Sequence, residues 1–114
     1  MTLLRSPEPR DLFPGALEMM VLQSLRREPM HGYALVQHIR QRSNELLQVE
    51  EGSLYPALQR LEMQGWVQSE WRTTPNHRRA RYYRLTAAGR KQLGVEISSF
   101  ERMVAAIGRV MRTA

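Results

Sequence analysis

The apolar residues of this chain change their spacing twice, and this change limits the folds that the sequence can adopt. Up to Gly65 they recur at steps of three and four, as on one face of an α-helix. After Gly65 they alternate with polar residues, as in a half-buried strand, and from Leu93 the helical spacing returns. The pattern predicts a mainly α fold with a small β-hairpin, in which a long helix follows the hairpin.

Three short amphipathic helices are predicted before Gly65. The first covers residues 16–27 and is stopped by Pro29, and the second covers 32–41, with 42–49 as a link. The third begins at Ser53, whose hydroxyl is placed to cap the first turn, and ends at Gly65, which tolerates positive φ. The inward positions are, in order, Leu17, Met20, Val21 and Leu25; Leu35, Val36 and Ile39; and Leu54, Ala57, Leu58 and Leu61.

Two strands, 66–72 and 80–85, are predicted around the turn segment TTPNHRR, and by alternation Tyr83 and Leu85 belong to the core. Thr86 then caps a last helix. Its apolar positions form a heptad seam: Leu93, Ile97, Phe100, Val104, Ile107 and Met111. The seam could pack onto its own domain. We favour a homodimer instead, because Met103 and Val110 widen the seam beyond what a surface helix needs.

The charge of the chain favours an anionic partner. Lys and Arg number 17 against 11 acidic residues, a net charge of +6, and every basic residue except Lys91 is arginine. Five arginines lie in the hairpin: Arg72, Arg78, Arg79, Arg81 and Arg84. Three helices and a basic hairpin are the element order of a winged helix-turn-helix, whose third helix enters the DNA major groove. Double-stranded DNA is therefore the expected partner.

Three segments, MHGYALVQHI, EEGSLYPALQRLEMQGWV and RARYYRLTAAGRKQL, resemble in order and spacing the signature segments of the PadR family of bacterial transcriptional regulators. The resemblance implies a homodimer that binds operator DNA as a repressor. It releases the DNA when a small-molecule effector binds or changes in level. A twofold dimer predicts an inverted-repeat operator. The single last helix resembles the short subgroup, in which it packs on the partner's first helix, so Leu17, Met20 and Val21 are expected at the interface.

The sequence is expected to divide into three parts. Residues 1–13, which contain two prolines, are expected to form a flexible N-terminal arm, 14–86 the DNA-binding domain and 87–114 the dimerisation helix. No apolar stretch is long enough for a membrane span and no signal peptide is recognisable, so the cytoplasm is the expected location. Cysteine is absent from the sequence, which excludes disulfides and thiolate chemistry.

Eight residues are candidates for DNA contact. Ser53 and Tyr55 lie at the start of the third helix, where backbone N–H groups face phosphate, and Gln59 is placed to reach a base edge. Arg60 could bind phosphate or pair with Glu62 or Glu50. Tyr33 matches a family tyrosine near the DNA backbone, although a buried packing role is equally consistent. The wing supplies the remaining candidates, Arg78, Arg79 and Arg81.

Other classes of function lack their residues. No phosphate-binding loop, nucleophile elbow or carboxylate pair is recognisable, so we expect neither an enzyme nor a bound cofactor. His31 and His38 share a helical face, but no further ligands lie nearby, so we expect no metal site. A winged helix that binds protein instead of DNA is the alternative. Phe100 and Met103 are the candidate effector contacts, and a closed interface without a ligand remains equally open.

Overall fold

The computed structural model describes residues 15–112 and confirms the predicted fold class, with one strand added. The expected arm at 1–13 lies outside the described residues. In chain order the elements are α2 (Ala16–Leu25), β1 (Met30–His31), α3 (Gly32–Arg42), α4 (Glu51–Met63), β2 (Val67–Thr73), β3 (Arg79–Leu85) and α5 (Ala87–Met111).

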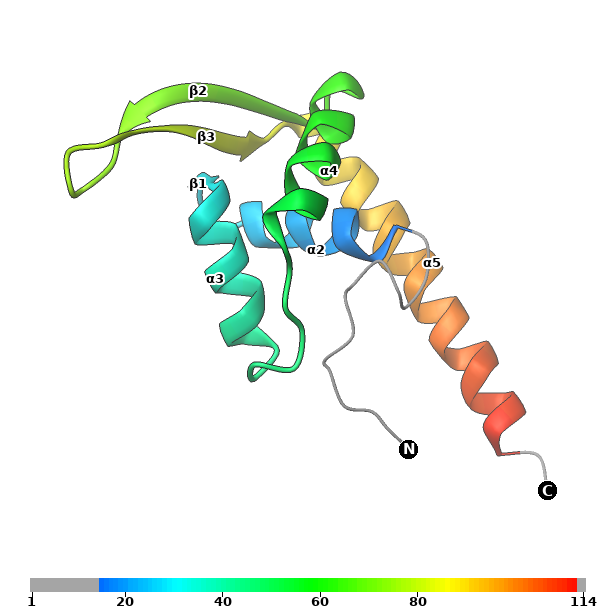
Figure 1. Cartoon of the computed structure of the whole chain (residues 1–114). Helices are drawn as coiled ribbons and strands as arrows, with labels where there is room; N and C mark the ends of the chain where they lie inside the picture. The colour runs from blue at the N-terminus through cyan, green and yellow to red at the C-terminus, as the bar shows by residue number, and fades with distance from the viewer. Residues whose placement is uncertain (1–14, 113–114) are drawn as a thin grey trace.

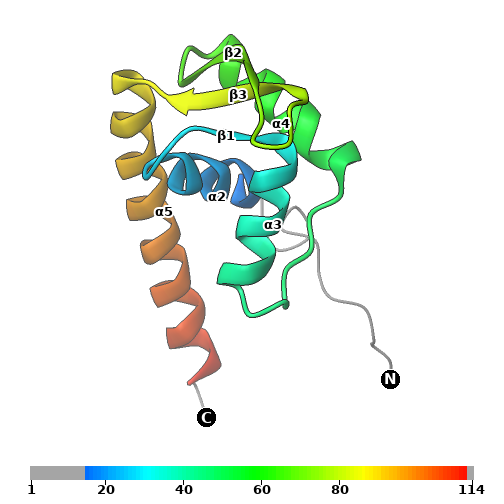
Figure 2. The ribbon, with the colours of Figure 1, turned by 90° about the vertical axis from the view of Figure 1, so that its left-hand side faces the viewer.

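The short helices gather against one face of the sheet, with α2 between α4, α3 and the first half of α5 (Figure 1). Their apolar stripes meet in one core. The largest fully buried side chains are Leu22, Leu35, Leu54, Leu58, Leu61, Val21 and Val67. Two elements leave this core: the hairpin of β2 and β3 extends to one side, and the last turns of α5 extend below it (Figures 1 and 2).

The sheet has three antiparallel strands in the order β1-β3-β2. The periodicity of the sequence did not predict β1, because a strand of two residues is too short to show alternation. Met30 pairs with Tyr83 and His31 with Tyr82, so β1 joins the base of the hairpin to the start of α3. This strand fixes the hairpin relative to the helices.

The start of α4 corrects the prediction for Ser53. The helix begins at Glu51 with Glu50 as its N-cap, and the Ser53 N–H donates to the Glu50 carbonyl at 3.0 Å. Ser53 is therefore a residue of the first turn and its hydroxyl is not the cap. Gly65 ends the helix as predicted: its φ is +78°, a conformation that glycine adopts without strain.

The junction between the hairpin and α5 is tightly bonded. Thr86 is the predicted cap: its Oγ1 accepts from the Gly89 N–H at 2.9 Å and donates to the Gly65 carbonyl at 2.8 Å. The Thr86 N–H donates to the Trp66 carbonyl at 3.1 Å. A Cβ at Gly89 would lie 2.0 Å from that same carbonyl oxygen, so only glycine fits there. The end of α4 and the start of α5 are therefore held together.

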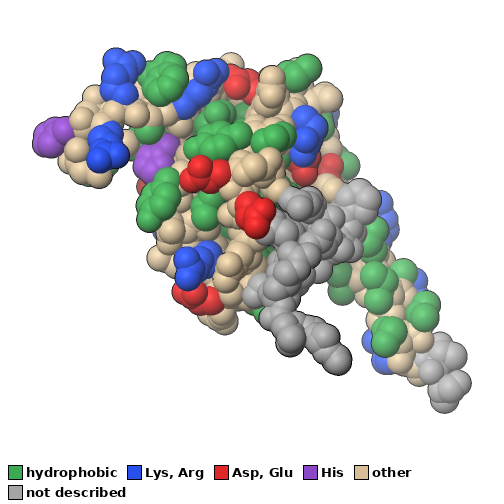
Figure 3. Space-filling view, viewed as in Figure 1, with side chains coloured by type: hydrophobic (Ala, Val, Ile, Leu, Met, Phe, Trp, Pro, Cys, Tyr) green, Lys and Arg blue, Asp and Glu red, His purple; other side chains and the backbone are tan. Residues whose placement is uncertain are grey.

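The burial of the predicted dimer residues divides them into two groups. Leu17, Val21 and Leu93 are buried in the chain's own core, and their place in an interface stays a prediction. Met20 and Ile97 are half-buried, as is Phe100. The exposed members are Met103, Val104, Ile107, Val110 and Met111. They follow the last turns of α5, where Figure 3 shows apolar side chains along the projecting helix.

Within residues 15–112, no helix combines the length and the apolar character that crossing a bilayer requires.

Candidate nucleic-acid interface

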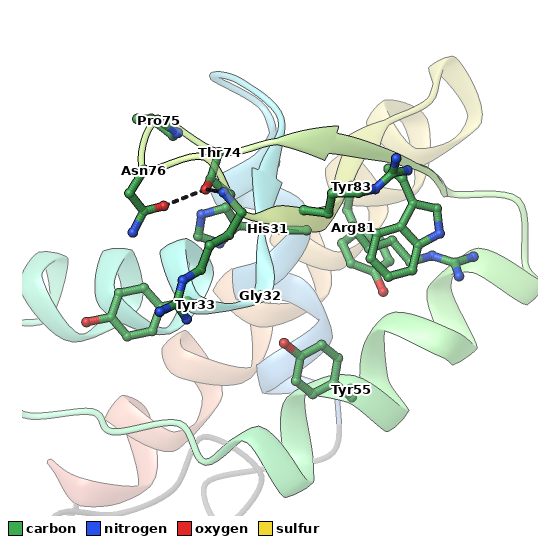
Figure 4. Close-up of a pocket in the computed structure, with 13 residues that line it drawn as sticks. His31, Gly32, Tyr33, Tyr55, Thr74, Pro75, Asn76, Arg81 and Tyr83 are labelled. Carbon is green, nitrogen blue, oxygen red and sulfur yellow. Dashed lines mark hydrogen bonds between the residues drawn. The ribbon is translucent and has the colours of Figure 1, made fainter.

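A groove of about 870 Å³ lies between the hairpin and the N-terminal ends of α3 and α4 (Figure 4). It contains five of the eight predicted DNA contacts: Tyr33, Tyr55, Arg78, Arg79 and Arg81. The other lining residues are His31, Gly32, Trp71, Thr74, Pro75, Asn76, Ala80 and Tyr83. Aromatic rings, guanidinium groups and small polar side chains thus share one surface.

One face of the hairpin supplies the upper wall of the groove, and its chemistry changes along its length. Strand side chains alternate, so facing pairs two positions apart lie on the same face. The pair nearest the helices, Val67 and Leu85, is buried. Further out, Trp71 faces Arg81 and Thr73 faces Arg79. The same face is therefore core at its base and an exposed basic surface toward its tip.

Arg78 and Arg79 carry unshared positive charge near the tip. Neither guanidinium pairs with a carboxylate in the part of the chain that the structure describes. The Cζ atom of Arg79 lies 5.9 Å from the ring centroid of Trp71, a cation–π contact that leaves its N–H donors available. Both side chains are exposed and can bind an anion bidentately.

Arg81 lines the groove but already has partners. Its Nε donates to Ser69 Oγ at 2.8 Å, and its Nη2 lies 3.4 Å from Glu62 Oε2. Ser69 in turn donates to the same carboxylate oxygen at 2.7 Å. Glu62 therefore offsets part of the charge of Arg81, which makes Arg81 a weaker phosphate ligand than Arg78 or Arg79.

Tyr55 reaches the groove from α4 because residue 32 is glycine. A Cβ at Gly32 would lie 2.4 Å from the Tyr55 hydroxyl oxygen and 2.8 Å from its Cζ. Burial, and secondarily the Glu51 carboxylate, raise the pKa of the Tyr55 phenol. Burial also raises the pKa of Tyr83, partly offset by Arg81. Both phenols are therefore neutral near pH 7 and can donate a hydrogen bond to an anion.

Tyr33 and His31 come from the start of α3. Tyr33 is 62% exposed, so the alternative of a buried packing tyrosine is wrong. His31 is the N-cap of α3: its Nδ1 accepts from the Ala34 N–H at 3.1 Å, and the ring of Tyr82 packs edge-on against it at 5.1 Å. The cap fixes the entry to α3 and with it the position of Tyr33.

Three predicted contacts lie outside the groove. Ser53 and the exposed Gln59 are on α4, Gln59 about one turn beyond Tyr55. Arg60 pairs with neither Glu62 nor Glu50. It binds Glu18 of α2 through Nε at 2.9 Å and Nη2 at 2.7 Å, so it joins α4 to α2.

The sequence interpretation missed several groove residues, notably Trp71, His31, Thr74 and Asn76. Thr74 and Asn76 order the tip: Thr74 Oγ1 contacts Asn76 Oδ1 at 2.5 Å and accepts from the Arg78 N–H at 3.1 Å. Strand alternation would have found Trp71, since it lies on the same face as Val67. His31 was considered only as a metal ligand, and its position as the N-cap of α3 was not predicted.

Comparison with known proteins gives a consistent result. The model of the transcriptional regulator PadR-like family matches residues 21–95. A transcriptional regulator from Clostridium thermocellum superposes with a TM-score of 0.79 at 28% identity, covering 87% of this chain and 96% of that one. A PadR family regulator from Eggerthella lenta gives 0.75 at 34% identity, covering 88% and 85%. Transcriptional regulator Rv3488 of Mycobacterium tuberculosis is 33% identical over 94 residues, 82% of this chain and 84% of that protein.

Proposed function

The chain belongs to the PadR-like family of transcriptional regulators, and on this premise we propose that it binds operator DNA as a homodimer and represses transcription. The observation that carries the proposal is the groove between the hairpin and the helix N-termini. It brings two arginines without a carboxylate partner, Arg78 and Arg79, together with two tyrosine side chains, Tyr33 and Tyr55. This combination suits the sugar-phosphate backbone of a duplex.

In the proposed complex, α4 enters the major groove and the hairpin follows the adjacent backbone. Tyr55 and Gln59 are on the exposed side of α4, where Gln59 can donate to and accept from an adenine edge. Ser53, in the first turn, is near the N-terminal N–H groups that bind phosphate. Arg60 holds α4 against α2 through Glu18, so we assign it a positioning role in place of a phosphate contact.

The dimer part of the proposal rests on the exposed end of α5. Val104, Ile107 and Met111 lie on one side of the helix and are 51%, 54% and 76% exposed. A second α5 with the same stripe would cover them. On α2, Met20 is the predicted interface residue that still has accessible surface, and it lines a groove of about 350 Å³ between α2 and α3.

The effector is a further part of the proposal. Phe100 is half-buried and Met103 is 40% exposed, one turn apart on α5. A small apolar molecule between two α5 helices would contact these residues first. A closed interface that binds no effector is the alternative, and added ligand would then leave DNA affinity unchanged.

The test is a fluorescence-anisotropy titration of purified protein against the duplex upstream of its own gene and a scrambled duplex of equal length. We expect preference for the upstream duplex at both low and high salt, because base contacts survive screening better than phosphate contacts do. Equal and salt-labile binding to both would contradict the proposal. It would favour the alternative, a winged helix that binds a protein.

A further inference from the structure

Trp71 is the one large aromatic side chain of the exposed part of β2, and the fold does not use it. Its indole is 57% exposed, whereas Val67, at the base of the same strand face, is fully buried. A single exposed apolar residue is ordinary on a protein surface. Trp71 differs because it lines the groove together with the arginines and Tyr83.

The indole is linked to a phosphate-binding candidate. Arg79 is paired with Thr73, two positions nearer the tip than the pair of Trp71 and Arg81 and therefore on the same face. Its side chain lies back over the indole, with Cζ 5.9 Å from the ring centroid. Arg81, which faces Trp71 directly, is occupied by Ser69 and Glu62. Trp71 therefore orders the arginine that keeps its hydrogen-bond donors.

We propose that Trp71 is a DNA-contact residue: its indole packs on a deoxyribose of the strand bound in the groove, and it holds Arg79 toward the neighbouring phosphate. The inference rests on the proposed function and extends it to a residue so far unassigned. A guanidinium beside the ring directs a phosphate to that point, and the apolar part of the backbone next to a phosphate is its sugar. The contact is independent of base sequence, because every nucleotide carries the same sugar.

The two tryptophans of the chain allow a direct test. Trp66 is half-buried at the end of α4 and does not line the groove. In Trp66→Phe the only indole is Trp71, and we expect its emission to change when duplex is added. In Trp71→Phe the only indole is Trp66, and its emission should stay constant. Circular dichroism checks that both variants are folded.

Affinity gives the second measurement. Trp71→Ala should weaken binding to operator and scrambled duplexes alike by about tenfold, a loss at the lower end of what removal of a stacked aromatic costs in single-stranded complexes. Arg79→Ala should weaken binding less in the Trp71→Ala background than in the wild type, because its guanidinium is then no longer ordered.

The outcomes separate this inference from the function on which it rests. Constant Trp71 emission during binding, or wild-type affinity in Trp71→Ala, would overturn the role of Trp71 while leaving the regulator a DNA-binding protein. A wild-type protein without affinity for any duplex would overturn both.

Discussion

The hairpin and α5 both begin in the core and both extend beyond it, but the side chains on their projecting parts differ in chemistry. On the hairpin, the buried pair of Val67 and Leu85 gives way to Trp71 and Arg79. On α5, buried Leu93 gives way to Val104 and Ile107, which are also apolar. Figure 3 shows the same contrast, with basic side chains on the hairpin and apolar ones along α5.

This difference teaches what each surface is suited to meet. A face that changes from apolar to basic as it leaves the core matches a polyanion, whose backbone offers phosphates and sugars. A face that remains apolar matches another apolar face, and a second copy of the same helix supplies one. We therefore expect opposite requirements for charge: adding a charge to the end of α5 should disrupt its contact, and removing a charge from the hairpin should weaken its contact.

The largest effect is expected at the apolar end. Ile107→Glu would place a carboxylate in the proposed interface, where an unpaired buried charge costs several kcal/mol. We expect the dimer dissociation constant to rise at least about a hundredfold, with loss of specific operator binding. Sedimentation velocity measures the mass. Because Ile107 is 54% exposed in the single chain, the helix content should not change.

Ala105→Glu is the matched control for this change, because Ala105 is exposed and lies on the side of the helix away from Met103 and Val110. It should remain dimeric. If Ile107→Glu sediments as a dimer, the interface lies elsewhere and the two projecting regions do not differ as described.

The next effect concerns the basic end. Arg78→Ala should weaken binding to every duplex by about tenfold and reduce the salt slope by about one, because one phosphate contact is lost. Affinities at several salt concentrations measure both quantities. Arg84→Ala removes the same charge from the opposite face of the hairpin, where Arg84 contacts Gln68, and should have less effect. Equal effects would mean that only overall charge matters.

A smaller effect should distinguish a paired arginine from the unpaired ones. Glu18→Gln removes the carboxylate that binds Arg60 and should lower the free energy of unfolding by up to about 1 kcal/mol, the range for partly exposed ion pairs. Urea unfolding measures this change. Glu45→Gln, which breaks the more exposed pair with Arg40, is the control and should cost less. If Glu18→Gln instead strengthens duplex binding, Arg60 binds phosphate once the Glu18 carboxylate no longer competes for it.

The smallest effect appears only at alkaline pH. Burial raises the pKa of Tyr83 in the folded chain, so the unfolded chain loses this proton first. Stability from this residue is full below the unfolded pKa of about 10 and is lost as pH rises through the folded value. Tyr83→Phe should therefore flatten the decline of stability above that pH in urea titrations. A decline of the same steepness in Tyr83→Phe would assign the effect to another group, such as Tyr55.

The sequence predicted the parts of the fold that repeat. Helices and hairpin strands bury a face at regular spacing, so Leu54, Ala57, Leu58 and Leu61 could be placed in the core from their spacing alone. Strand β1 was missed because two residues carry no period. The start of α4 was set too late, because Ser53 has a side chain that suits a cap whereas the backbone uses Glu50.

The site was predicted less completely because its details depend on distant contacts. Spacing can show that Arg60 faces outward, but not that Glu18, 42 positions away, binds it. Composition shows a basic hairpin, but only the contacts of Arg81 with Ser69 and Glu62 distinguish it from Arg79, which has no carboxylate partner among the described residues. The groove position of Trp71 could have been predicted, because strand alternation places it on the same face as Val67.

The bonded junction of Thr86 and Gly89 gives α5 the mechanics of a lever arm. The helix has 25 residues and is about 37 Å long. A rotation of one degree about the junction therefore displaces the far end by about 0.6 Å. In the proposed dimer, the separation of the two DNA-binding surfaces therefore depends on how firmly the bonds at Thr86 and Gly89 hold the start of α5.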